Sequence, residues 1–146
     1  GLETTWLLKA ERERLDGFYA RCLRKLLGVA PSFVSRVSNK IVLDRFGARP
    51  LSTQLLQRQL LFYGKLAGQA NTSLPRSVAL EPADVTPRFW NMRRCVGRPR
   101  LRWTSCVFAV AVQVARGNVA ELRQLLLQSP QQDEWRARVT SFLKSL

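Results

Sequence analysis

The chain has 146 residues, enough for one domain with a modest core, and a hydrophobic content of 46% that excludes wholesale disorder. Its charge is unusual: 24 Lys and Arg residues stand against ten Asp and Glu residues, giving a net charge of +14. Nineteen of these cations are Arg, whose guanidinium binds phosphate through two hydrogen bonds, so we expect RNA or DNA before an anionic membrane surface or an acidic protein.

Three helices are predicted in residues 1–67. The first covers residues 4–27 and ends at Gly28, on the strength of an apolar stripe at helical spacing. The stripe consists of Leu8, Leu15, Phe18, Tyr19, Cys22, Leu23 and Leu26. The second helix covers residues 39–46, between an N-cap at Ser38 or Asn39 and a stop at Gly47. The third follows Pro50, with Ser52 or Thr53 as its N-cap, and has the most regular stripe: Leu56, Leu60, Tyr63 and Ala67.

Residues 68–102 form the middle part of the chain, and Pro, Gly and Asn interrupt every periodic pattern from 68 to about 100. These residues predict a long loop, of the kind that is usually functional or disordered. The sequence from Asp84 to Glu121 contains seven Arg residues and no acid between those two positions. We call residues 88–102 the basic segment, because they hold six of the seven: Arg88, Arg93, Arg94, Arg98, Arg100 and Arg102.

Three further elements are predicted in residues 103–146. Residues 103–115 fit a helix or a strand, and we favour the helix because no other segment offers a strand to pair with. Residues 118–128 predict a helix capped by Asn118, and residues 132–146 predict another with Trp135 and Val139 on its apolar side. The expected fold is all-α, an irregular bundle of five or six helices with a long basic loop before the fourth. We expect one domain or a fragment of one.

No catalytic residue, cofactor site or metal site is predicted. The chain has no His, and its acids are scattered rather than clustered as two-metal chemistry requires. The only adjacent acids, Asp133 and Glu134, are expected on a first helical turn, where the helix dipole favours negative charge. Three widely spaced Cys residues suit a reducing compartment and predict neither a disulfide framework nor a zinc site. We therefore expect no independent enzyme.

Membrane segments are not expected either. The longest apolar run, residues 106–112, is far below the roughly 18 residues that span a bilayer. No secretory signal is recognisable at the start of the chain. The chain begins with Gly-Leu-Glu, and its only methionine is Met92, so we expect a processed product or a fragment of a longer reading frame.

Three interpretations of the basic segment are open. It can bind phosphate as a strip of guanidinium groups, with counterion release supplying the affinity. Its Gly97-Arg98-Pro99 core is similar to the AT-hook that inserts into the DNA minor groove, although Val96 stands where that motif has its first Arg. The third interpretation is a solvated, charged loop that binds nothing. We favour the phosphate-binding strip.

The Trp residues have two expected roles. Trp103 and Trp135 lie on apolar stripes, which favours packing in the core. Trp90 lies within the basic segment, and we regard it as the best candidate for stacking on an unpaired base. The predicted nucleic-acid-binding residues are therefore Trp90 and the six Arg residues of the basic segment.

A series of short motifs occurs in one order along nearly the whole chain. They are ETTW at 3–6, LDGF at 15–18, RCLRKLLG at 21–28, RVSN at 36–39, PL at 50–51, RQLLFYG at 58–64, LPR at 74–76, GRPRLRW at 97–103 and EWR at 134–136. In this order they resemble the region after the polymerase domain in non-LTR (LINE-type) retrotransposon reverse transcriptases. Lys65 and Ser105 stand where that family often has His and Asp, which indicates a diverged copy.

The resemblance implies a segment downstream of a polymerase domain whose catalytic aspartates precede Gly1. Such a segment would hold template RNA or target DNA, with the upstream polymerase domain as its partner. It would be intracellular, in a nuclear or cytoplasmic ribonucleoprotein. The alternative from another class is a helical structural or protein-interaction module of a ribonucleoprotein, with no nucleic-acid specificity of its own.

Overall fold

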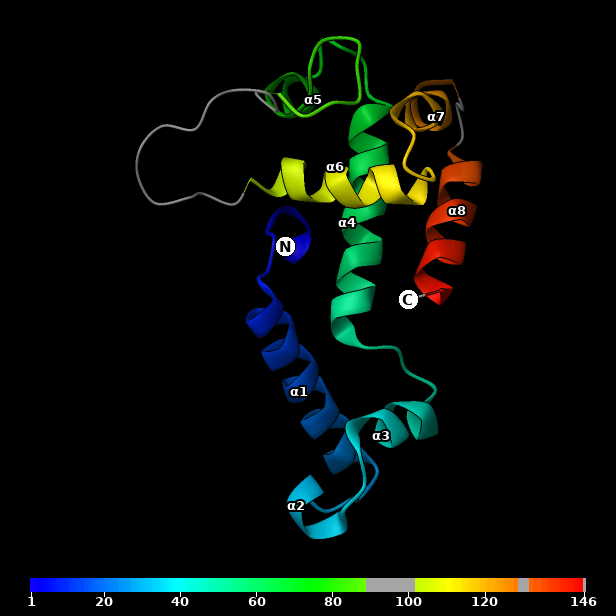
Figure 1. The fold of residues 1–146 in the computed structure, drawn as a ribbon. Helices are drawn as coiled ribbons and strands as arrows, with labels where there is room; N and C mark the ends of the chain where they lie inside the picture. Colours follow the sequence, from blue (N-terminus) through cyan, green and yellow to red (C-terminus); the bar gives the residue numbers. More distant parts are fainter. Residues whose placement is uncertain (89–101, 129–131, 146) are drawn as a thin grey trace. The chain divides into compact units, whose positions relative to one another are not determined.

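The computed structural model describes residues 1–88, 102–128 and 132–145 (Figure 1). Within these residues the chain forms eight α-helices and no strand, so the all-α prediction is confirmed and the predicted number of helices is too low. The chain divides into two compact units: a small unit, Leu7–Leu56, and a large unit, Gly1–Trp6 together with Gln57–Leu146. No helix in the described part of the chain is long and apolar enough to cross a membrane.

The small unit contains α1 (Lys9–Leu26), α2 (Ser32–Ser35) and α3 (Asn39–Phe46). The Glu11 carboxylate accepts a hydrogen bond from the Leu8 backbone N–H at 2.6 Å, which caps the start of α1. Gly28 ends it in the left-handed region, at a φ of +65°, as predicted. The α3 bounds are those predicted, with the Ser38 hydroxyl accepting from the Ile41 N–H. The helix α2 was not predicted, because four residues are too few to show a periodic pattern.

Burial in the small unit corrects the predicted α1 stripe. The buried residues of α1 are Ala20, Leu23 and Arg24, and Val42 of α3 is fully buried. Phe18 and Leu26, which belong to the predicted apolar stripe, are 57% and 73% exposed. The apolar side of α1 is therefore only partly covered within this unit. Helical spacing predicts which residues share a face and leaves open whether anything packs on it.

The third predicted helix is α4 (Leu51–Ala67), and its start corrects the expected cap. Ser52 and Thr53 lie inside the helix, and the Pro50 carbonyl accepts the Gln54 N–H at 3.2 Å. The Ser52 N–H and hydroxyl both donate to the Asp16 carboxylate of α1, at 2.8 and 2.6 Å. Ser52 thus ties the start of α4 to α1 within the small unit.

The large unit is organised around the second part of α4. It contains α6 (Trp103–Val114), α7 (Val119–Arg123), a π-helical turn η2 (Gln124–Gln128) and α8 (Asp133–Lys144), together with a 3-10 turn η1 (Leu2–Thr4). The helix predicted over 103–115 is confirmed, since Val107, Ala111 and Val114 are buried along one helical face. Figure 1 shows α6 crossing α4, with α8 near the same part of α4. Leu60, Tyr63 and Trp135 are fully buried where these helices meet.

Part of the predicted loop is helical. Residues Leu74–Ala79 form α5, with Pro75 in its first turn, where the missing N–H costs no helical hydrogen bond. After α5 the chain turns back on itself through a single antiparallel bridge between Leu80 and Pro87. A loop from residue 68 onward is therefore the wrong description of residues 74–79. Residues 89–101, which hold most of the basic segment, lie outside the described part.

Candidate nucleic-acid interface

The structure places both ends of the basic segment. Arg88 follows the Leu80–Pro87 bridge, and its backbone N–H donates to the Ala79 carbonyl at 2.9 Å. Its guanidinium is exposed and donates to the Ser77 carbonyl at 2.7 Å, near the end of α5. Arg102 is exposed and is the N-cap residue of α6, in an extended conformation. The first and last residues of the basic segment therefore both belong to described parts of the large unit: Arg88 follows the Leu80–Pro87 bridge, and Arg102 precedes α6.

The other predicted site residues are not placed by the structure. Trp90, Arg93, Arg94, Arg98 and Arg100 lie outside the described residues, so their contact with nucleic acid stays a prediction.

A group of polar contacts, which we call the clasp, holds the chain just before the basic segment. The Asp84 carboxylate binds Arg123 of α7 through two hydrogen bonds of 2.7 and 2.8 Å. It also accepts from the Thr86 hydroxyl at 2.8 Å and the Val85 N–H at 2.7 Å. The hydrogen bonds from Arg123, aided by those from Thr86 and Val85, lower the pKa of Asp84 from 3.8 to about 2 against the opposing effect of desolvation. The negative charge of the Asp84 carboxylate is therefore already compensated by Arg123 within the clasp.

Buried polar groups complete the clasp. The Tyr63 hydroxyl donates to the Val85 carbonyl, and burial followed by the Asp84 charge raises the pKa of Tyr63 well above its usual value. Arg76 is 2% exposed and donates to the carbonyls of Ala67 and Asp84, the latter at 3.1 Å. These contacts fix residues 84 and 85 against α4 and α5. The sequence does not reveal this, because the partners are far apart along the chain.

Two of the Trp residues pack inside the large unit. Trp135 is fully buried, and its indole N–H donates to the Leu60 carbonyl at 3.0 Å. Trp103 is half-buried, and its ring lies 5.6 Å from that of Phe62 and 6.4 Å from that of Tyr63, centroid to centroid. Both therefore pack against α4, in agreement with the expected role in the core, and the fully buried ring of Trp135 cannot stack on a base.

Most of the acids are used in local contacts. Glu121 and Glu134 both bind Arg138, Glu3 binds Arg58, and Glu13 binds Lys9. Many cations of the described part are exposed and have no ion pair there. They are Arg14, Arg21, Lys25, Arg36, Lys40, Arg45, Arg49, Lys65, Arg116, Arg136 and Lys144. The positive charge of the described part of the chain is therefore largely exposed to solvent.

The structure also reveals a second basic region, in the small unit. No acid occurs between Asp16 and Asp44, whereas five cations do: Arg21, Arg24, Lys25, Arg36 and Lys40. This region was not predicted, because its cations are spread over two predicted helices and the residues between them and form no dense run. The lack of Asp and Glu between residues 16 and 44 was the sequence feature that could have revealed this region. Arg24 donates hydrogen bonds to the Val37 carbonyl and the Asn39 side chain, which holds the backbone next to Arg36 and Lys40 at the last turns of α1.

The described residues contain no group of three or more His, Cys, Asp and Glu side chains able to hold a metal ion. No protein-family model, curated protein or solved structure matches the chain.

Proposed function

We propose that this chain is a non-catalytic nucleic-acid-binding segment that contacts template RNA or target DNA through its basic segment. By resemblance, it would lie downstream of the polymerase domain of a LINE-type reverse transcriptase. The observation that carries the binding proposal is the charge arrangement around the segment. The basic segment holds six Arg residues, of which Arg88 and Arg102 are the first and the last, and the preceding acid, Asp84, is already bound by Arg123.

The physical basis is the neutralisation of phosphates by exposed guanidinium groups. Each phosphate contact releases condensed counterions, so the affinity falls steeply as salt rises. A protein with six to ten such contacts loses about 10³–10⁵ in affinity between about 50 and 200 mM salt. Fluorescence anisotropy of labelled RNA and DNA, titrated with the full chain at both salt concentrations, measures this dependence. A shallow salt dependence contradicts binding through phosphates.

A matched pair of variants locates the site. In the first, Arg93, Arg94, Arg98, Arg100 and Arg102 are all changed to Glu, and we expect nucleic-acid binding to be lost. In the second, the same change is made at five exposed cations of helices and turns: Arg45, Arg49, Lys65, Arg136 and Lys144. Because both variants lose the same net charge, a site in the basic segment requires the first to bind far more weakly than the second. Circular dichroism checks that both remain helical. Equal losses would place the binding elsewhere.

A second candidate function, a helical protein-interaction module, is favoured by one observation. Leu74 and Val78 lie four residues apart on α5 and are 74% and 65% exposed. They make an apolar pair on one helical face, which suits a protein partner better than a phosphate backbone. Changing both residues to Ser should leave nucleic-acid affinity unchanged under our proposal. A chain that binds neither RNA nor DNA at low salt would favour this candidate instead.

A further inference from the structure

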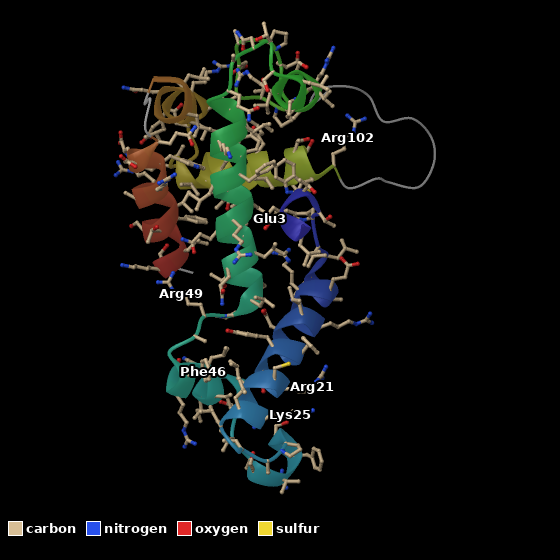
Figure 2. All side chains as sticks on the ribbon, turned by 180° about the vertical axis from the view of Figure 1, so that it is seen from behind. Glu3, Arg21, Lys25, Phe46, Arg49 and Arg102 are labelled. Atoms are coloured by element: carbon tan, nitrogen blue, oxygen red, sulfur yellow. The ribbon has the colours of Figure 1, made fainter. Side chains whose placement is uncertain are left out.

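One side of α1 carries an aromatic ring among cations. Arg14, Phe18, Arg21 and Lys25 are spaced by four, three and four residues, so they share one stripe of the helix. All four are exposed, and Phe18 is 57% exposed. Figure 2 labels Arg21 and Lys25, one helical turn apart near the end of α1. An exposed ring flanked by three cations is thus built into this helix.

The residues that join α2 to α3 lie beside the end of α1. The Arg24 guanidinium donates to Ser35 Oγ at 3.4 Å, to the Val37 carbonyl at 2.5 Å and to Asn39 Oδ1 at 3.0 Å. These bonds hold the connection from α2 to α3 against the last turns of α1. Phe33 on α2 is 76% exposed, and Arg36 and Lys40 are exposed beside the bonded residues. We define the basic–aromatic face by its members: Arg14, Phe18, Arg21, Lys25, Phe33, Arg36 and Lys40.

Charge in the small unit favours a polyanion. The unit has ten Lys and Arg residues against four Asp and Glu residues, a net charge of +6. Three of the four acids are used locally, since Glu11 caps α1, Glu13 pairs with Lys9, and Asp16 binds Ser52. The fourth, Asp44, lies on α3 beyond the acid-free stretch. The basic–aromatic face is therefore strongly positive.

We propose that the basic–aromatic face binds single-stranded nucleic acid, as a second site separate from the basic segment. Arg21, Lys25 and their neighbours would contact phosphates, and the rings of Phe18 and Phe33 would stack on unpaired bases. A duplex offers no free base faces to these rings. An anionic membrane is disfavoured because membrane-surface helices separate cations and apolar residues onto opposite faces, whereas α1 mixes them on one stripe.

The test separates stacking from general apolar contact. The full chain is titrated against a labelled single-stranded oligouridine and a DNA duplex of the same length. Changing Phe18 and Phe33 together to Leu keeps the apolar surface and removes the aromatic rings, whereas changing both to Tyr keeps rings. Base stacking predicts at least a fivefold loss of single-strand affinity for the Leu pair, since one stacked base contributes about 1–3 kcal/mol. The Tyr pair should bind as the native chain does, and duplex affinity should not change for either.

A second set of variants tests the cations of the basic–aromatic face. Arg21→Glu with Lys25→Glu should weaken single-strand binding more than Arg136→Glu with Lys144→Glu, an equally charged pair of exposed residues on α8. The inference is overturned if the Leu pair binds single strands like the native chain, or if the two charge-reversal pairs behave alike. It is also overturned if the chain binds phosphatidylserine vesicles and the Leu pair retains all single-strand affinity.

The outcome is distinguishable from that of the proposed function. Charge reversal of the basic segment reports on that segment alone, and the Leu pair reports on the small unit alone. If only the Leu pair weakens binding, the basic–aromatic face stands and the basic segment does not bind. If only the charge reversal in the basic segment weakens binding, the basic–aromatic face is excluded.

Discussion

Arg24 and Arg76 are buried and bind backbone carbonyls rather than acids. Arg24 is 4% exposed and bonds to residues between α2 and α3, and Arg76 is 2% exposed and bonds to the last residue of α4. A guanidinium offers five N–H donors in a rigid plane, so one side chain can satisfy several carbonyls at the end of a helix. These two residues therefore contribute to the fold, and they are unsuited to gripping phosphate.

Gly64 allows Trp135 of α8 to pack closely against α4. A Cβ atom at this position would lie 2.5 Å from Cδ1 and Nε1 of Trp135. Trp135 is fully buried and hydrogen-bonded to Leu60, so it has little room to move. We expect Gly64→Ala to lower the free energy of unfolding by about 1–3 kcal/mol through overpacking, as measured by urea denaturation.

Gly17 provides the matched control for this substitution. It lies within α1, and a Cβ there would meet no atom within 4 Å. Gly17→Ala should therefore stabilise the chain by up to about 1 kcal/mol through helix propensity alone. If both substitutions shift stability in the same direction, the close contact between Gly64 and Trp135 does not exist in solution.

At the scale of elements, the clasp joins α7 to the loop after α5 and lies directly before the basic segment. The guanidinium of Arg123 on α7 donates two hydrogen bonds to the Asp84 carboxylate. This bidentate pair fixes the relative orientation of the two side chains as well as their distance. The Asn118 side chain begins α7 by accepting the Ala120 N–H at 2.8 Å, so the position of Arg123 follows from a local cap. A short helix thus anchors one end of the predicted interface.

The clasp should make stability depend on pH in the acid range. The pKa of Asp84 is about 2 in the folded chain and near 3.8 when its partners are lost. Because folding lowers this pKa, the stabilisation is complete above pH 3.8 and is lost as the pH falls towards 2. We expect a contribution on the order of 1 kcal/mol, since solvent screens the half-exposed Arg123.

Urea denaturation of Asp84→Asn beside the native chain measures this contribution. The variant should be less stable at pH 6, and the difference between the two should shrink as the pH falls below 4. Asp44→Asn, at an exposed position of α3, serves as the control and should follow the native pH dependence. A difference for Asp84→Asn that stays constant down to pH 2.5 would mean that the ion pair does not stabilise the fold.

For the molecule as a whole, the net positive charge is the feature that most affects how its stability depends on salt. A net charge of +14 makes the folded chain repel itself, because the exposed cations outnumber the acids near them. Salt shortens the range of this repulsion, with a Debye length of about 30 Å at 0.01 M and about 10 Å at 0.1 M. We therefore expect the melting temperature to rise by a few degrees between these salt concentrations.

Differential scanning calorimetry at several NaCl concentrations measures this rise. A variant with five exposed cations changed to Gln (Arg45, Arg49, Lys65, Arg136 and Lys144) should melt higher at low salt and respond less to added salt. A melting temperature that falls with added salt would show that attractive ion pairs outweigh the repulsion.

The longer helices and the excess of positive charge could be predicted from the amino-acid sequence alone. The helices α3, α4, α6 and α8 follow from apolar spacing and from local signals such as Ser38 and Gly47, which act within a few residues. The excess of Arg over acidic residues can likewise be counted in the sequence without knowledge of the fold. The basic segment could be located from the sequence, and the structure adds the positions of Arg88 and Arg102.

The remaining features could not be predicted, because they depend on short elements or on contacts between residues far apart in the chain. The short helices α2 and α5 lack the length for a periodic signal. Burial of Arg24 and exposure of Phe18 depend on what packs against α1, which its own sequence does not specify. The basic–aromatic face draws its residues from α1, α2 and the start of α3, and the hydrogen bonds of Arg24 join these elements only in the folded chain.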